Sequence, residues 1–152
     1  MEAAQCLLRL QRLCSRAEYC SADVYRKALK DLDGDAEAAA RVVDRLREER
    51  FVDDARYAAA FAREKASLQG WGPVKIRFRL RGKGLSEEDI AAGLAQVDPG
   101  KADARLEKLL RDRQRVLAGD PQARLKLLKY GLCRGYGYDA VEAALAKIGN
   151  NS

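Results

Sequence analysis

The stretch Trp71-Gly-Pro-Val-Lys-Ile-Arg-Phe-Arg-Leu-Arg-Gly-Lys-Gly84 decides between two fold classes. Apolar and basic residues alternate along it one by one, which on pattern alone is typical of an amphipathic strand. A strand needs a partner, and no other segment has strand character, so a lone strand would leave its backbone groups unpaired. The flanking residues also favour a helix, because Pro73 suits a first helical position and Gly-Lys-Gly84 suits a helix end. We therefore predict a short helix here.

On a helix, the apolar residues of this stretch divide into two pairs. Ile76 and Leu80 share one face, and Val74 and Phe78 share another, roughly 160° away. If Ile76 and Leu80 face the core, Phe78 stands partly exposed between arginines, an arrangement that suits phosphate contact and base stacking. Alternatively, both pairs are buried between two packed layers and the basic residues are merely solvated. The sequence leaves both arrangements open.

The rest of the chain is also typical of an all-α protein. Alanine, leucine, arginine, lysine and glutamate dominate, and only three of the 152 residues are prolines. Start signals such as Asp before Pro, and breaks at glycine, recur at short intervals. We expect nine helices, which begin near Ala3, Ser21, Asp35, Asp53 or Asp54, Pro73, Ser86, Asp98, Asp120 and Gly137.

The last two helices carry explicit predictions about their buried faces. Asp120-Pro121 repeats the start signal of Asp98-Pro99, so the eighth helix should begin there. Helical spacing predicts that this helix buries Leu125, Leu128 and Leu132. The ninth helix should turn three apolar residues inward, namely Val141, Leu145 and Ile148.

Part of the sequence is repeated. Residues 83–94 align without gaps to residues 134–145, sharing a basic residue, a glycine, an apolar residue directly after it and two apolar positions further on. Residues 31–46 follow the pattern loosely, with Gly34 as the matching glycine. Three tandem three-helix repeats, at residues 1–50, 51–97 and 98–149, are the economical interpretation. Chance likeness among amphipathic helices is the alternative.

The net charge of +6 is unevenly distributed. Residues 1–70 hold 13 basic and 13 acidic residues, whereas residues 71–84 hold five basic residues and no acidic one. Residues 101–134 hold 10 basic and 4 acidic residues. Such asymmetry indicates nucleic acid or an acidic protein surface as a partner. A basic surface that serves only solubility is the alternative.

Residue types and motifs for catalysis are scarce. The sequence has no histidine, and no common nucleophile, phosphate-loop or metalloprotease motif occurs. Asp53-Asp54 could bind a metal, but helix capping is the commoner role of acids just before a helix. We therefore expect a protein that is not an enzyme and that has no cofactor and no metal.

The spacing of the four cysteines also argues against a metal site. None of the four, Cys6, Cys14, Cys20 and Cys133, belongs to a C-x-x-C pair, so structural zinc is not expected. We expect all four to be buried small side chains. Neither a secretory signal peptide nor a long apolar run is visible, which predicts a cytosolic protein with reduced thiols and no membrane contact.

The centre of the chain carries a distinctive set of residues, namely Phe51-Val-Asp-Asp-Ala-Arg-Tyr-Ala58, Gly70-Trp-Gly-Pro73, Ile76, Leu80 and Lys83-Gly84. This set resembles the core signature of the RecX regulatory family. The resemblance covers about residues 5–148 and extends to the first repeat through Ser15-Arg-Ala-Glu18 and Tyr25-Arg-Lys-Ala-Leu29. The third repeat departs from the pattern at Gly131 and Gly137, which leaves its helix limits open.

The resemblance implies a fold and a function. It implies that the three three-helix repeats form an elongated, curved helical array in a bacterial, cytoplasmic protein. Such a protein binds the RecA recombinase filament, and single- or double-stranded DNA, as a monomer and without catalysis. It would dampen recombination, ATPase and coprotease activity in DNA repair and the SOS response, by blocking filament extension or promoting disassembly.

The candidate contact residues come from the two basic segments. Two other functions stay open from the residues alone: a basic nucleic-acid-binding helical protein without a recombinase partner, and a helical scaffold for protein interactions that ignores DNA. The candidates for DNA or filament binding are Trp71, Lys75, Arg77, Phe78, Arg79, Arg81, Lys83, Lys126, Lys129 and Arg134.

Overall fold

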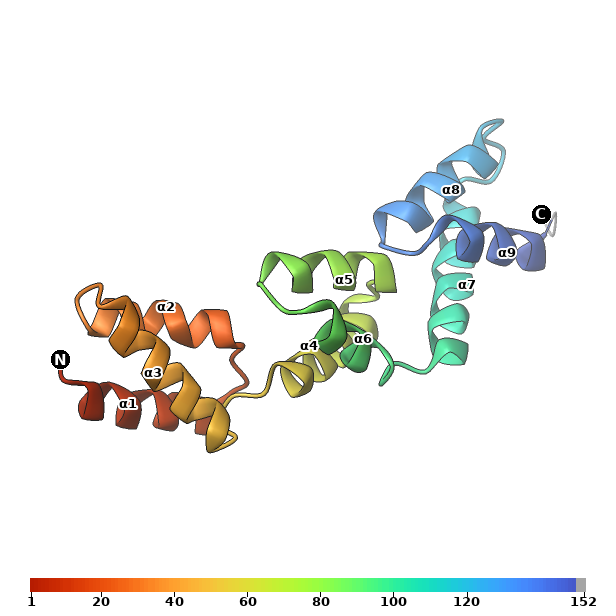
Figure 1. The fold of residues 1–152 in the computed structure, drawn as a ribbon. Helices are drawn as coiled ribbons and strands as arrows, with labels where there is room; N and C mark the ends of the chain where they lie inside the picture. Colours follow the sequence, from red (N-terminus) through yellow and green to blue (C-terminus); the bar gives the residue numbers. More distant parts are fainter. Residues whose placement is uncertain (150–152) are drawn as a thin grey trace. The chain divides into compact units, whose positions relative to one another are not determined.

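The computed structural model describes residues 1–149, and over that range the chain forms nine α-helices and no strand (Figure 1). The predicted all-α class is confirmed, and the basic stretch is a helix despite its alternating pattern. The helices are α1 (Ala3–Arg16), α2 (Ser21–Asp31), α3 (Ala36–Glu48), α4 (Asp54–Gln69), α5 (Pro73–Gly82), α6 (Glu87–Leu94), α7 (Pro99–Val116), α8 (Ala123–Cys133) and α9 (Tyr138–Ile148).

Helix α5 adopts the first of the two predicted arrangements. Ile76 and Leu80 are 1% and 0% exposed, whereas Val74 and Phe78 are 55% and 71% exposed. Burying an aliphatic side chain of this size stabilises a fold by about 1.5–3 kcal/mol, so the inward pair orients the helix. The opposite face, with Phe78, is left in solvent.

The contacts divide the chain into two compact units. The first unit comprises Met1–Ala60 and Leu80–Gly93, and the second comprises Phe61–Arg79 and, among the described residues, 94–149. The boundaries of the three predicted repeats, at residues 50 and 97, stay a prediction.

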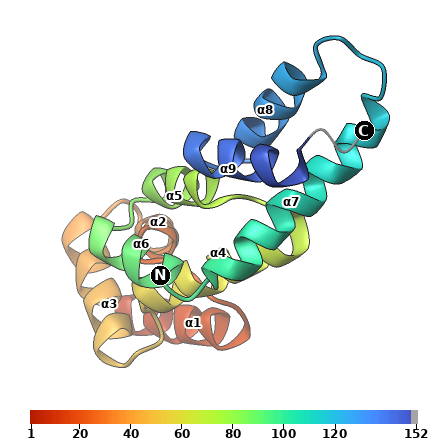
Figure 2. The same ribbon diagram turned by 90° about the vertical axis from the view of Figure 1, so that its right-hand side faces the viewer.

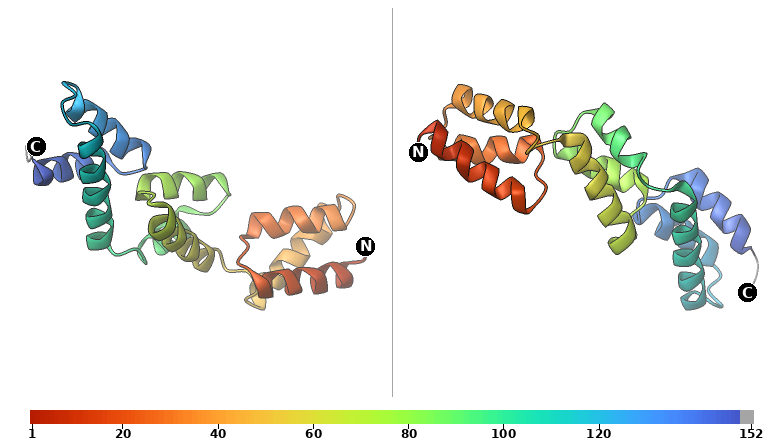
Figure 3. Two further views of the ribbon diagram at one scale, coloured as in Figure 1. Left: turned by 180° about the vertical axis from the view of Figure 1, so that it is seen from behind. Right: turned by 90° about the horizontal axis from the view of Figure 1, so that it is seen from below.

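In the first unit, α1, α2 and α3 pack against one another around one core (Figure 3). Each helix turns one apolar stripe inward, and Asp35 caps α3 by accepting a hydrogen bond from the Ala38 N–H at 3.1 Å. The largest fully buried residues of this core are Leu10, Leu46 and Val24.

Ser21 does not cap α2 as its sequence position suggests. The N-cap residue is Cys20, which makes no side-chain capping bond. The Ser21 hydroxyl oxygen instead accepts a hydrogen bond from Arg47 Nε at 2.9 Å, and its N–H donates to Asp54 Oδ1 at 2.7 Å. Asp53 is the residue that caps α4, since its Oδ1 accepts from the Arg56 N–H at 3.0 Å. Asp53 therefore caps α4, whereas Asp54 holds the first residue of α2.

In the second unit, α7, α8 and α9 pack pairwise around another core (Figure 2). Asp98 caps α7 and Pro99 occupies its first turn, as predicted. Val141, Leu145 and Ile148 of α9 are all buried, which confirms the predicted inward face of that helix.

The prediction for α8 is wrong in both start and face. The helix begins at Ala123, because Asp120 Oδ1 caps a turn by accepting from the Gln122 N–H at 2.8 Å. Leu125 and Leu132 are exposed and Leu128 is only half-buried, whereas Leu127 is buried. The cause is Gly131, four residues after Leu127: a Cβ there would lie 2.8 Å from a Val141 methyl carbon. Backbone contact at Gly131 turns the Leu127 face toward α9.

The aligned glycines end their helices in the same way. Gly84 after α5 and Gly135 after α8 have φ of +85° and +96°. The residue after each glycine, Leu85 or Tyr136, is buried and donates its N–H to the carbonyl five residues back, at 3.3 Å and 3.2 Å. This is the Schellman ending that glycine favours, and it accounts for the shared basic–glycine–apolar pattern.

Cys6 and Cys20 are buried, as expected, whereas Cys14 is only half-buried. Burial raises the pKa of the Cys6 thiol to about 11, so this side chain stays neutral and behaves as a small apolar group. Cys133, on the last turn of α8, is exposed, so the prediction fails for it. Cys133 does not lie on the Leu127–Gly131 face, which is the face of α8 that is turned toward α9.

Candidate nucleic-acid interface

The loop before α5 is held by backbone hydrogen bonds to the turn between α8 and α9. The Gly72 N–H donates to the Arg134 carbonyl at 2.9 Å. The N–H groups of Val74 and Lys75, which the first turn of a helix leaves unpaired, donate to the Gly135 carbonyl at 2.9 and 3.3 Å. The start of α5 is thus fixed in position within the second unit.

This joint needs glycine on both sides. A Cβ on Gly72 would lie 2.4 Å from the Gly135 carbonyl oxygen, and a Cβ on Gly135 would lie 2.3 Å from Lys75 Cβ. Two side-chain bonds add to the joint: Arg134 Nη2 donates to the Gln69 carbonyl at 2.6 Å, and the Tyr136 hydroxyl donates to the Gly70 carbonyl at 3.3 Å. The Gly-Trp-Gly-Pro signature is therefore explained in part by packing.

Trp71, held by this loop, is half-buried and has three cations around its ring. The distances to the ring centroid are 4.4 Å from Lys75 Nζ, 5.0 Å from Lys65 Nζ and 5.2 Å from Arg79 Cζ. The indole also meets the Phe61 ring edge to face, with centroids 6.2 Å apart. The negative face of an aromatic ring attracts cations, so Trp71 gathers charges that would otherwise repel one another.

The three cations, which we call the Trp71 cluster (Lys65, Lys75 and Arg79), have no acidic partner within residues 1–149. Lys75 and Arg79 are four residues apart and share one side of α5. A gathered set of positive charges without counter-charges favours an anion.

Phe78 and Arg77 border the cluster on α5 but differ in burial. Phe78 projects into solvent, with Arg77 before it and Arg79 after it in the chain. Arg77 is half-buried and borders a small hollow of about 240 Å³, whose lining includes Trp71, Ile76 and other apolar side chains. The exposed Phe78 ring is therefore the aromatic surface of α5 that a planar partner could cover.

The last two candidates of the basic stretch, Arg81 and Lys83, belong to the first unit. Arg81 Nη2 donates to Glu87 Oε2 at 3.1 Å, and this hydrogen-bonded contact raises the pKa of Arg81. Lys83 Nζ lies 5.7 Å from the centre of the Tyr57 ring, and a hydrogen bond with Tyr57 raises the pKa of Lys83. Both side chains therefore have protein partners already.

The candidates near α8 differ among themselves. Lys126 Nζ pairs with Asp120 Oδ2 at 2.5 Å. Arg134 is half-buried in the joint, and its Nε has no hydrogen-bond partner. Lys129 is exposed and forms no ion pair with a described residue. Of the ten predicted residues, the structure brings together Trp71, Lys75 and Arg79, with Phe78 beside them.

Sequence reasoning missed two residues of this site, Lys65 and Phe61. They lie on α4, four residues apart, and both approach Trp71. Their spacing places them on one face of a helix that ends just before Trp71, and this was the available signal. It was weak, because Lys65 lies in a segment whose charges balance.

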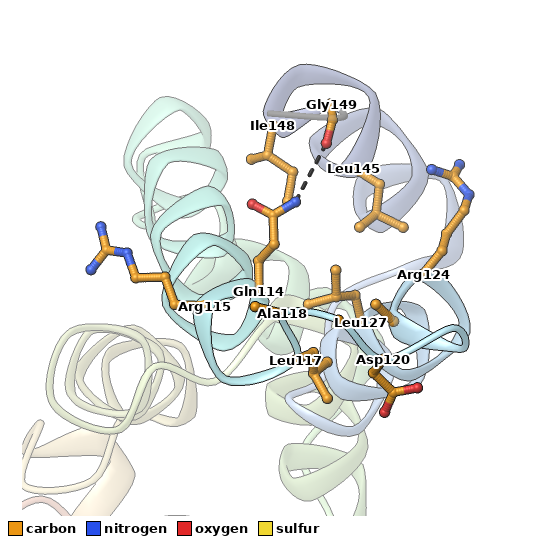
Figure 4. Close-up of a pocket in the computed structure, with 12 residues that line it drawn as sticks. Gln114, Arg115, Leu117, Ala118, Asp120, Arg124, Leu127, Leu145, Ile148 and Gly149 are labelled. Carbon is orange, nitrogen blue, oxygen red and sulfur yellow. Dashed lines mark hydrogen bonds between the residues drawn. The ribbon is translucent and has the colours of Figure 1, made fainter. Parts of the chain in front are cut away.

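The second unit also has a larger hollow, of about 620 Å³, where the end of α7 meets α8 and α9 (Figure 4). Leu127 and Leu145 project into it, while Arg115 and Arg124 point away. Gln114 Nε2 donates to the Gly149 carbonyl at 3.4 Å at one edge. Its lining is mostly aliphatic and brings no nucleophile and base together.

Residues 1–149 contain neither a metal-binding cluster nor a membrane-spanning helix. No three His, Cys, Asp or Glu side chains are grouped so as to hold a metal ion. None of the helices described is long and apolar enough to cross a membrane.

The fold and the Trp71 cluster define a class: an all-helical protein with a basic, aromatic-containing surface. Comparison with known proteins then identifies the family. The family description "RecX, second three-helix domain" matches residues 53–94. A regulatory protein RecX from Pseudomonas entomophila is 31% identical over 138 residues, which cover 88% of this chain and 85% of the relative. The chain belongs to the RecX family.

Further relatives and solved structures carry the same family name. A regulatory protein RecX from Mycolicibacterium smegmatis is 33% identical over 120 residues, covering 72% of this chain but 64% of that relative's length. A crystal structure of a regulatory protein RecX matches with a TM-score of 0.83 at 26% identity, over 95% of this chain and 71% of that one. RecX from Lactobacillus salivarius matches with a TM-score of 0.88 at 17% identity, over 96% of both chains, which supports the fold alone.

Proposed function

We propose that this chain regulates the RecA recombinase by binding its filament together with DNA. It lowers recombination, ATPase and coprotease activity, either by blocking filament extension or by promoting filament disassembly. It acts without catalysis, in the cytoplasm and as a monomer. The proposal includes its organisation as three-helix repeats at residues 1–50, 51–97 and 98–149.

Membership of a family whose relatives are named regulatory protein RecX supports the regulatory role. The single observation that carries the binding site is the Trp71 cluster, three cations gathered around one indole without acidic partners among the described residues. A nucleoprotein filament offers both phosphates and acidic protein groups to such a surface. Arg77, Arg81, Lys83, Lys126, Lys129 and Arg134 are further candidate contacts.

The direct test measures ATP hydrolysis and strand exchange by a RecA recombinase on single-stranded DNA, with increasing amounts of this protein. We expect inhibition that saturates at or below stoichiometric amounts. Recombinase activity that is unchanged at stoichiometric amounts would contradict the proposal.

The second candidate is a nucleic-acid-binding protein without a recombinase partner. The clustered cations favour it. About five phosphate contacts on a duplex would give a log–log salt slope of about −4.5. Co-sedimentation with filaments and with bare DNA separates the two functions. A regulator should sediment with filaments at salt concentrations that release it from bare DNA, whereas equal release from both supports the second candidate.

A further inference from the structure

The Trp71 cluster concentrates charge in a small volume. The three charge centres lie 4.4 to 5.2 Å from one ring centroid, so no two are more than about 10 Å apart, roughly one Debye length at 0.1 M salt. Salt therefore screens their mutual repulsion only partly. One anion placed among them would interact with all three charges at once, which an isolated surface lysine cannot achieve.

Trp71 itself is poorly placed to stack on a base. Three cations approach its ring, and the Phe61 ring meets it edge to face. The indole is also half-buried, and the loop that carries it is bonded to the turn after α8. The indole thus acts as the support that holds the cations.

Phe78 provides the stacking surface that Trp71 lacks. Its side chain is 71% exposed, although an aromatic ring of this size gains by burial. It lies three residues after Lys75 and one before Arg79, so its ring stands about 60° around the helix from Lys75 and about 100° from Arg79. Val74, four residues earlier and also exposed, extends the apolar strip along the helix.

We propose that this face binds single-stranded nucleic acid: the Trp71 cluster holds a backbone phosphate, and Phe78 stacks on an unpaired base beside it. The proposal rests on the proposed function and adds a strand preference to it. A duplex presents phosphates but keeps its base faces stacked inside, so it can use the cations and not the ring. An acidic protein segment would supply carboxylates but would not require a stacking ring at Phe78.

Trp71 allows a direct test because it is the only tryptophan of the sequence. Titration of the whole protein with a thymidine oligonucleotide should change the intrinsic tryptophan fluorescence, since the anion would bind within a few ångströms of the indole. Binding of the labelled oligonucleotide, seen by fluorescence anisotropy, without any change in tryptophan emission would overturn the assignment.

Two variants separate the roles. Phe78→Ala should weaken binding of the thymidine oligonucleotide between about fivefold and a hundredfold, without changing the salt slope or the affinity for a duplex of equal length. The variant K75Q/R79Q removes two charges but keeps their aliphatic stems, and it should reduce the single-strand salt slope by about 1.4. The matched control K30Q/R41Q removes two exposed charges from the first unit. It should leave the single-strand affinity and its salt slope unchanged.

The outcomes distinguish this inference from the proposed function. If Phe78→Ala binds the single strand as tightly as the parent protein, the inference is wrong, even where recombinase inhibition is intact. If Phe78→Ala loses single-strand affinity but the parent protein does not inhibit the recombinase, the strand-binding face stands and the proposed function fails. Equal losses on single strand and duplex, or a loss of recombinase binding alone, would also overturn the strand preference. Circular dichroism checks that each variant stays helical.

Discussion

Helices α5 and α8 both carry several basic residues, but the two helices use them differently. On α5, Lys75 and Arg79 gather around Trp71 and form no ion pair with any described residue. On α8, Lys126 pairs with Asp120 and Arg124 pairs with Glu142 at 3.4 Å. The net charge of a segment therefore does not tell how much of that charge is available to a partner.

The energetic difference between the two helices is modest but has a clear direction. Exposed ion pairs contribute about 0–1 kcal/mol, so a partner could break those of α8 at little cost. Lys75 and Arg79 of α5 need no such exchange, and both approach the same Trp71 ring. A phosphate should therefore favour α5, and α8 can add contacts once the nucleic acid is bound.

The largest expected effect concerns the inward face of α5. Ile76→Ala and Leu80→Ala should each lower the free energy of unfolding by about 2–5 kcal/mol, because both side chains are fully buried. Val74→Ala and Phe78→Ala, on the outward face, should change it by no more than about 0.5 kcal/mol. Urea unfolding followed by circular dichroism measures all four. Similar losses on both faces would mean that Phe78 is not free to contact a ligand.

The next effect tests the face of α8. Leu127→Ala should cost about 2–4 kcal/mol, since its side chain is buried against α9. Leu125→Ala, at a site 49% exposed, should cost less than about 1 kcal/mol. The same unfolding measurement applies. A reversed order would restore the face expected from the sequence pattern.

The joint that connects the start of α5 to the end of α8 should be sensitive to one added methyl group. Gly72→Ala and Gly135→Ala should each destabilise by about 1–3 kcal/mol through overpacking. Gly82→Ala is the matched control, because a Cβ there meets nothing within 4 Å. Thermal unfolding should show a lower midpoint for the first two variants only. Parent-like midpoints for Gly72→Ala would show that the loop is not held against the turn.

The smallest effect concerns the charge pairing of α8. The hydrogen bond from Lys126 holds the pKa of Asp120 below its ordinary value of 3.8. A lowered pKa means that the pair stabilises the fold above about pH 4 and that this contribution is lost as the pH falls below that value. An NMR titration should find a higher Asp120 pKa in Lys126→Ala and no change in Lys129→Ala. An unchanged value in Lys126→Ala would mean that Lys126 is as available as Lys75.

Much of the fold could be predicted, because helix starts and ends have local causes. Pro73, Asp98 and Ser86 act on backbone groups within a few residues, and the period-2 pattern of α5 was outweighed by its flanks. The face of α8 could not be predicted, because Gly131 packs against Val141 of another helix and carries no side chain to mark that contact. Helical spacing of leucines alone favoured the wrong face.

The candidate site could be predicted only in part for a similar reason. Trp71, Lys75, Phe78 and Arg79 lie in one visibly basic stretch, so composition was enough to select them. Composition also selected Lys126 and Arg134, whose partners Asp120 and the Gln69 carbonyl become evident only from the fold. Lys65 escaped because its role depends on where α4 ends relative to Trp71.

The most direct test of the account compares recombinase inhibition by three proteins: the parent chain, K75Q/R79Q and the control K30Q/R41Q. The readout is ATP hydrolysis by a RecA recombinase on single-stranded DNA at a fixed, moderate salt concentration. We expect the parent and the control to inhibit at stoichiometric amounts, and K75Q/R79Q to need several-fold more protein while keeping the same helical content. Inhibition by K75Q/R79Q at the same concentration as the parent would contradict a central role for the Trp71 cluster.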